Sequence, residues 1–199
     1  MIHVKRCTSP EVGHYLDAVA ELRIAVFREF PYLYDGSLEY ERSYLKTWEN
    51  TERAVLVLAF DGDKVVGAST GMPLEDEEEV FQAPFRAAAL DPAGFFYCAE
   101  SVLLPAWRGQ GLGLRFFAER EAHARELGGF HSVAFCAVCR PEDHPLRPPG
   151  YEPLNRFWEK RGFTRHPELR AHFSWKDIDQ EEQTSKPLEF WLKSLQYNT

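Results

Sequence analysis

The hydrophobic and polar positions near the start of the chain predict a strand followed by two helices. Residues 2–7 alternate as a strand does, and apolar side chains at spacings of three and four between residues 12 and 26 share one face of a helix. Ser9-Pro10 is expected to open this helix and Pro31 to end it. Residues 37–50 are expected to form the second helix.

The middle of the chain predicts a hairpin, a third strand and a long helix. Two apolar runs within residues 54–69 are separated by Asp61-Gly62, which is typical of a tight β-turn. Residues 95–104 form an apolar strand that leads into a glycine-rich turn. The helix after this turn is expected to reach about Leu127, because Gly128-Gly129 would stop it.

The remaining segments predict a second group of strands. Residues 131–138 are expected to form a strand, and a proline-rich loop over residues 141–153 leads to a short helix ending at Arg161-Gly162. Strand-like runs follow at residues 171–178 and 188–192. The last run, which includes Phe190-Trp191-Leu192, is expected to be an edge strand that contributes to a homodimer contact.

The order of these elements predicts an α/β (α+β) fold with a mixed, mainly antiparallel central sheet flanked by helices. Parallel pairing is required only where a helix connects two strands. A chain of 199 residues, 44% hydrophobic and 27% charged, suits one globular unit, so residues 1–199 are expected to form a single domain.

Charge and hydropathy narrow the class of partners. The formal net charge of -8 argues against nucleic acid, because phosphate binding needs clustered Lys and Arg, and it is compatible with a cationic substrate. No membrane span or secretory segment is recognisable, so a cytoplasmic location is expected. The acidic run at residues 75–79 is interpreted as a solvated helix start without a function.

The four cysteines predict neither a disulfide framework nor a metal site. Cys136 and Cys139 form a C-x-x-C pair, but no second pair or His pair stands at zinc spacing. Buried, reduced strand cysteines are the preferred interpretation. A covalent acyl-cysteine route is not favoured either, because no basic neighbour in the sequence would lower a thiol pKa there.

The glycine-rich turn carries the most specific signal in the chain. Gly109, Gly111 and Gly113 alternate just before the long helix, where unpaired N–H groups and the helix dipole favour an anion such as a pyrophosphate. The spacing satisfies neither the dinucleotide fingerprint nor a P-loop. A tight turn without a ligand is the alternative on this spacing alone.

The run Arg108-Gly109-Gln110-Gly111-Leu112-Gly113 resembles the signature of the GNAT superfamily of acetyl-CoA-dependent N-acetyltransferases. A later block at residues 155–163 matches in the same order. The resemblance implies that strands 95–104 and 131–138 splay apart to admit the cofactor acetyl-CoA. It also implies which residues bind the cofactor. The pyrophosphate would be bound by the backbone amides of Arg108, Gly109, Gln110, Gly111, Leu112 and Gly113. The pantetheine arm would pair with the main chain of Leu103 and Leu104, and Asn155 and Trp158 would contact the cofactor from the short helix.

The resemblance also suggests candidate catalytic residues. Glu100, just before the turn, would act as a base for the acceptor amine, or would pair with a cation or position the acceptor. An amide near Leu103 or Leu104 would stabilise the developing oxyanion. Many members of the family have a tyrosine at the position of Trp158, where it protonates the departing sulfur of CoA. Tyr151 is a candidate for this role here, and the alternative is that CoA leaves as a thiolate without a proton donor. Aromatics at residues 30–35 would wall the acceptor slot or pack on the sheet.

The expected activity is therefore N-acetylation by direct attack in a ternary complex. The acceptor is expected to be a primary amine of a small molecule or a protein, with no metal involved. Two other functions fit the sequence: a non-catalytic acyl-CoA-binding sensor that retains the cleft, and, less well, a phosphate- or nucleotide-binding module. Only an enzyme would release CoA when an acceptor is supplied.

Overall fold

The computed structural model describes residues 1–196, which share one eight-stranded sheet. The strand order is β1-β2-β3-β4-β6-β8-β7, and β5 pairs with β3. Only β4 and β6 pair in parallel among these neighbours, which confirms the predicted mixed, mainly antiparallel sheet. The strands are β1 Ile2–Cys7, β2 Val55–Asp61, β3 Lys64–Pro73, β4 Phe95–Tyr97, β5 Ser101–Leu103, β6 Ser132–Val138, β7 Thr164–Lys176 and β8 Gln183–Ser194.

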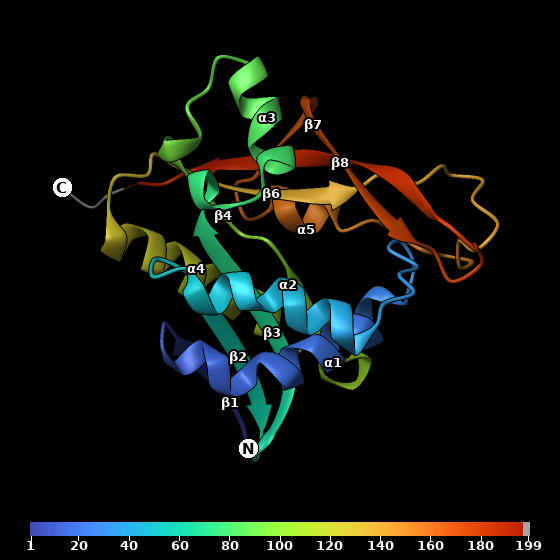
Figure 1. Cartoon of the computed structure of the whole chain (residues 1–199), viewed down its shortest axis with the longest axis horizontal. Coiled ribbons are helices and arrows are strands. Elements are labelled where there is room, and N and C mark those ends of the chain that lie inside the picture. The colour runs from blue at the N-terminus through green and yellow to red at the C-terminus, as the bar shows by residue number, and fades with distance from the viewer. Residues whose placement is uncertain (197–199) are drawn as a thin grey trace.

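Helices cover both faces of the sheet. In Figure 1, α1 and α2 lie side by side across the β1–β3 part of the sheet. The α-helices are α1 Leu16–Phe27, α2 Leu38–Asn50, α3 Glu79–Ala87, α4 Leu112–Leu127 and α5 Asn155–Glu159. Within residues 1–196, no helix combines the length and apolar character needed to cross a bilayer.

Alternation along β2 explains why helices pack on both sides. Successive strand side chains point to opposite faces, and nearly all of β2 is buried. One set packs in a cluster with α1 and α2: Leu56, Leu58 and Phe60. The other set packs in a cluster with α4: Val55, Val57 and Ala59. The continuous apolar run in the sequence thus reflects a strand covered on both faces.

The strand predicted over residues 95–104 is interrupted, and the interruption separates two strands. β4 pairs with β6 as far as Tyr97, and Cys98 N donates to Ala134 O at 2.7 Å. Beyond this point β5 continues the pairing with β3 but does not pair with β6, which pairs with β8 on its other side. The predicted splaying is therefore confirmed, and the irregular segment is residues 98–100.

Arg120 of α4 supports this irregular segment from beneath. Its side chain is 1% exposed and donates to the carbonyl oxygens of Thr70 at 3.2 Å, Glu100 at 3.0 Å and Phe116 at 3.3 Å. A buried carbonyl outside a regular ladder needs such a donor. Burial lowers the pKa of Arg120, which nevertheless stays a strong cation. α4 thereby fixes the backbone of Glu100.

Two boundary predictions differ from the structure. A 3-10 turn at Glu11–Tyr15 precedes the first α-helix, which begins at Leu16 and ends at Phe27. The acidic run at residues 75–79 was interpreted as a helix start, but α3 begins only at its last residue, Glu79. Local propensity identifies a helical region, but where it begins depends on packing.

The edge-strand prediction for Phe190-Trp191-Leu192 is wrong. β8 lies between β6 and β7, and Phe190 and Trp191 are buried. β7 is longer than its apolar run indicated, and it pairs with β8 to take the edge position. The proposed homodimer contact therefore loses this support.

Candidate active site

The glycine turn forms an open cradle at the N-terminus of α4. Gly109 has a φ of +75° and Gly111, which caps the helix, a φ of +80°. These left-handed conformations favour glycine. A β-carbon built at either position would meet no atom within 4 Å, so the space beside the backbone is free. An anionic group such as a pyrophosphate fits this cradle.

Two side chains brace the turn. Gln110 Nε2 donates to Ala106 O at 3.2 Å. Arg108 Nε donates to Leu103 O at 2.9 Å, and its Nη1 pairs with Glu29 at 2.8 Å. Both side chains fold back on the protein, so the ligand-binding capacity of this segment lies in its backbone amides and in the helix dipole.

The main chain of β5 distinguishes Leu103 from Leu104. Leu104 N donates to Val66 O at 3.0 Å and is therefore used within the sheet. Because bonding directions alternate along an antiparallel strand, Leu103 points its amide away from β3, toward the gap between β5 and β6. Of the two residues expected on the pantetheine arm, Leu103 is the one with an open amide.

The short helix α5 lies alongside the turn. Asn155 begins α5, and the ring of Phe157 would come within 3.6 Å of a β-carbon at Gly113. Trp158 is partly buried, with its ring centroid 4.9 Å from Phe135 and 5.1 Å from Trp191. The indole is therefore a packing element of the core that borders the gap.

A cavity of about 230 Å³ opens at the irregular segment between β4 and β5. Its lining includes Ala99 and Glu100 from this segment, Tyr97 from β4 and Cys136 from β6. The rest comes from α1, α2, the loop between them, α3, β7 and β8. Tyr32 and Tyr34 contribute from residues 30–35, the region expected to wall an acceptor slot.

Glu100 is paired with a buried arginine. Arg23 of α1 is 11% exposed at its side chain and forms ion pairs with Glu41 Oε2 and Glu100 Oε2. Tyr34 Oη donates to Glu41 Oε1 at 2.7 Å. Burial opposes the charge on Arg23, but Glu100, Tyr44 and Glu41 raise its pKa above the usual value. Arg23 is thus a permanent cation shared by two carboxylates.

One oxygen of Glu100 stays open. The residue is 8% exposed and lines the cavity, and its Oε1 has no hydrogen-bond partner among residues 1–196. A buried carboxylate oxygen without a partner is costly, which favours a ligand that donates a hydrogen bond. Sequence reasoning left open whether Glu100 pairs with a cation or acts as a base. The structure places Oε2 on a cation and leaves Oε1 available.

The acidic run conceals a buried carboxyl that sequence reasoning missed. Glu77 was expected to be solvated with its neighbours, but it is 6% exposed. Glu78 N donates to its Oε1 at 3.0 Å, whereas Oε2 has no partner within the described part of the chain. Burial, with the charge of Glu100 adding to it, raises the pKa of Glu77 to about 7. Nothing in a run of five acidic residues indicates which one is buried.

The part of the chain that carries this site matches a known protein family. A model of the acetyltransferase (GNAT) family matches residues 18–163, a range that contains the cradle, Arg23 and Glu100. The chain belongs to the GNAT acetyltransferase family. The resemblance in the sequence is thereby confirmed. A comparison with curated proteins found no match.

Solved structures share the GNAT fold over nearly the whole chain. An aminoglycoside 6'-N-acetyltransferase complexed with coenzyme A is 13% identical, with a TM-score of 0.62 and 99% of each chain covered. The yncA protein of Salmonella typhimurium with its cofactor acetyl-CoA is 14% identical, with a TM-score of 0.59 and coverage of 99% of this chain and 96% of that one. An acetyltransferase from Thermus thermophilus is 18% identical, with a TM-score of 0.57 and coverage of 98% and 97%. At these identities the likeness shows the fold alone.

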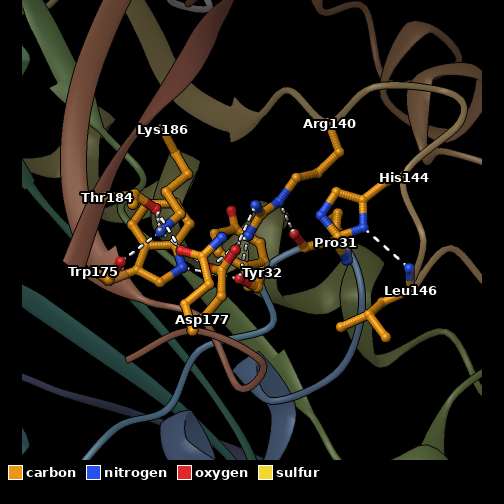
Figure 2. A network of polar contacts seen from close by, with 10 residues as sticks. Pro31, Tyr32, Arg140, His144, Leu146, Trp175, Asp177, Thr184 and Lys186 are labelled. Carbon is orange, nitrogen blue, oxygen red and sulfur yellow. Dashed lines mark hydrogen bonds and ion pairs between the residues drawn. The ribbon is translucent and has the colours of Figure 1, made fainter. Parts of the chain in front are cut away.

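A buried polar network fixes one wall of the cavity in this GNAT protein (Figure 2). Arg140 forms two hydrogen bonds with Asp177, at 2.8 and 2.9 Å, and also donates to the carbonyl oxygens of Pro31 and Tyr32 at 2.7 Å. Trp175 Nε1 donates to the same Tyr32 oxygen at 2.9 Å. The network ties the loop that carries Tyr32 to β7, and both Tyr32 and Trp175 line the cavity.

Arg140→Met is expected to destabilise the protein by about 2 kcal/mol at neutral pH, with Lys186, 3.1 Å from Asp177, limiting the loss. Burial alone would raise the pKa of Asp177, but hydrogen bonds from Arg140 and Lys186 hold it below its usual value. This stabilisation exists above the unfolded pKa and disappears as the pH falls through the folded one. Urea unfolding should therefore show a loss that shrinks as the pH falls below the usual pKa of an aspartate, and a pH-independent loss would contradict this account.

The candidate acid Tyr151 lies outside the cavity lining. Its ring packs edge-on against Phe30, with centroids 4.7 Å apart, and Arg147 lies over it. Burial raises the pKa of Tyr151, which makes it a weaker acid at neutral pH. This position favours a packing role over proton donation.

The two thiols of the C-x-x-C pair differ in burial: Cys136 is buried, and Cys139 is partly exposed. Cys136 Sγ lies 3.1 Å from Tyr97 Oη, and burial raises the pKa of this thiol to about 12. Burial raises the pKa of Cys139 as well. In residues 1–196, no three His, Cys, Asp or Glu side chains group closely enough to hold a metal ion. A protonated thiol at Cys136 is a poor nucleophile.

Proposed function

We propose that this protein transfers an acetyl group from acetyl-CoA to a primary amine by direct attack in a ternary complex. The observation that carries the proposal is the arrangement of three features: the glycine cradle, the gap between β5 and β6, and a cavity at the irregular segment before β5, where a Glu100 oxygen is open. Two of the solved structures with the same fold contain coenzyme A or acetyl-CoA, which supports acetyl-CoA as the acetyl donor.

The cofactor side of the site would use mainly main-chain groups. Amides from Arg108 to Gly113 would receive the pyrophosphate, and Leu103 would pair with the pantetheine arm as an added strand does. Asn155 and Trp158 would border the same arm from α5. When bound, acetyl-CoA supplies the acetyl group as a thioester.

The acceptor side would use Glu100. A lysine-like amine must lose a proton before it attacks, at a cost of about 4 to 5 kcal/mol at pH 7. Glu100 Oε1 would take this proton, directly or through water. The nitrogen then bonds to the acetyl carbon, the carbon–sulfur bond breaks, and the nitrogen gives up its second proton to solvent or to the departing sulfur. The thiolate can leave unaided at a cost of about 2 kcal/mol at pH 7, and Tyr151 is the alternative proton donor.

We also propose that residues 1–199 form one N-acetyltransferase domain. All strands of residues 1–196 belong to one sheet, and the family match spans most of it. A cytoplasmic location stays a prediction from the sequence.

The decisive experiment is a calorimetric titration with acetyl-CoA followed by an assay of free CoA release against a panel of primary amines. Binding with amine-dependent release is the expected result. Binding without release by any amine would favour the sensor. An absence of binding would contradict the proposal.

Glu100→Gln is expected to lower kcat about 100-fold, because a positioned base contributes at least this much in typical cases. Acetyl-CoA affinity, measured by calorimetry, should stay within about twofold, because the cradle is untouched. An unchanged kcat with an identified acceptor would make Glu100 a structural residue.

A further inference from the structure

Aromatic residues make up nearly half of the lining of the cavity beside Glu100. Nine of its twenty lining residues are aromatic, and they come from separate elements, among them Tyr44 of α2, Phe81 of α3, Tyr97 of β4 and Phe173 of β7. Phe81 stacks on Phe173, with ring centroids 5.6 Å apart. Aromatic walls favour a flat apolar group, through burial and through edge or face contacts with the rings.

The charges around the cavity are nearly all neutralised. Arg23 is shared by Glu41 and Glu100, and Asp35 pairs with Lys176 at 2.7 Å. Glu100 Oε1 is the charged oxygen in the lining that lacks a partner among the described residues. The site thus offers one place for a hydrogen-bond donor that can carry a positive charge.

We propose that the acceptor is a primary amine carried on a single aromatic ring or an apolar group of similar size. Its nitrogen would contact Glu100 Oε1, and its ring would lie between the aromatic walls. This inference rests on the proposed acetyltransferase function, and it adds the substrate class to it.

Size and charge both oppose larger, polycationic acceptors. A cavity of about 230 Å³ lies below the usual range for drug-sized ligands, so a one-ring compound suits it better than a multi-ring sugar. A second ammonium group inside it would find carboxylates that are already paired, and burying an uncompensated charge is strongly unfavourable. The aminoglycoside acceptor named for a relative of the same fold is therefore not expected here.

The first test compares acceptors. With acetyl-CoA saturating, kcat/KM for 2-phenylethylamine should exceed that for 1,4-diaminobutane or kanamycin by about tenfold or more, because burial of the ring adds favourable transfer free energy. Equal or greater activity with the polycations, or with the N-terminus of a peptide, would overturn the substrate class while leaving the acetyltransferase intact.

The second test uses matched variants. Phe173→Ala should raise KM for 2-phenylethylamine about fivefold or more, leave KM for ethylamine within about twofold, and preserve acetyl-CoA affinity. Tyr15→Ala removes a partly buried aromatic that packs on Phe60 outside the cavity, and it should change neither KM. Equal effects of both variants on both amines would contradict the proposal.

A binding measurement separates this inference from the proposed function. Calorimetry of 2-phenylethylamine with the wild-type protein should show saturable binding that Phe173→Ala weakens. Such binding without any CoA release would support an aromatic amine as the ligand of the cavity and reject the enzyme. CoA release with other amines, but no binding or turnover of 2-phenylethylamine, would reject the substrate class and support the enzyme. If 2-phenylethylamine neither binds nor reacts and no other amine reacts, the substrate class is overturned.

Discussion

Gly111→Asp is expected to weaken acetyl-CoA binding by on the order of 1000-fold. The residue caps α4 with a φ of +80°, and the space beside it is free. A carboxylate there would lie where the cradle is open to a pyrophosphate. Two like charges about 4 Å apart near a protein surface repel by about 4 kcal/mol, which corresponds to three decades in affinity.

The same variant should keep its fold. Because a β-carbon at Gly111 meets no atom within 4 Å, the substitution adds no clash, and aspartate tolerates the left-handed region better than most residues. Gly62→Asp is a matched control, since Gly62 has a φ of +61° and open space in the β2–β3 hairpin. Calorimetry should show a loss for Gly111→Asp alone. Equal affinities of both variants would remove the turn from the binding site.

Arg23→Met is expected to destabilise the protein by about 3 to 5 kcal/mol. The substitution leaves the buried carboxylates of Glu41 and Glu100 without their shared cation. Methionine fills much of the same volume, so the loss reports mainly the uncompensated charge. Urea unfolding followed by circular dichroism measures it directly.

The position of the charge decides the size of this effect. Arg42→Met provides the control, because Arg42 pairs with Asp17 at 2.7 Å between exposed side chains of the same two helices. Its urea midpoint should barely change, since exposed pairs contribute little. Adding Glu41→Gln to Arg23→Met should recover part of the stability by removing one unpaired charge. A loss below about 1 kcal/mol for Arg23→Met would mean that the carboxylates are solvated or protonated.

Elements defined by neighbouring residues could be predicted from the sequence. Ser37 caps α2 by accepting a hydrogen bond from Tyr40 N at 3.3 Å, and Gly62 takes the left-handed conformation expected of the hairpin turn. Such signals lie within a few residues of the element that they start or end. For the same reason α2, the hairpin and the end of α4 were placed correctly.

Pairing between distant segments was not predictable in this way. The predicted strand over residues 95–104 is broken at residues 98–100: both halves pair with β3, but only the first half also pairs with β6. β8 lies inside the sheet because β7 pairs along its outer side. An apolar strand has the same sequence pattern at an interior position as at a protected edge, so the pattern does not specify the neighbour.

The acceptor side of the site illustrates the same limit for charged residues. Arg23 and Glu100 are 77 positions apart in the sequence. Arg23 lies next to the apolar face of a helix, and a solvent-exposed arginine at this position would give the same sequence pattern. Glu77 is buried within a run of acidic residues that otherwise signals solvent exposure. Neither burial has a local signature, because it results from helices and strands converging on one cavity.

The sequence by itself determined the glycine cradle and the family, because the spacing of Arg108 to Gly113 specifies a backbone conformation that neighbouring residues enforce. It also indicated Glu100 as a candidate, from its place just before the turn. The tertiary structure alone decided that Arg23 holds one oxygen of Glu100 and that aromatic residues surround the other. These contacts join segments that are remote in the chain, and only the packing of α1, α2, α3 and β7 around the splayed strands brings them together.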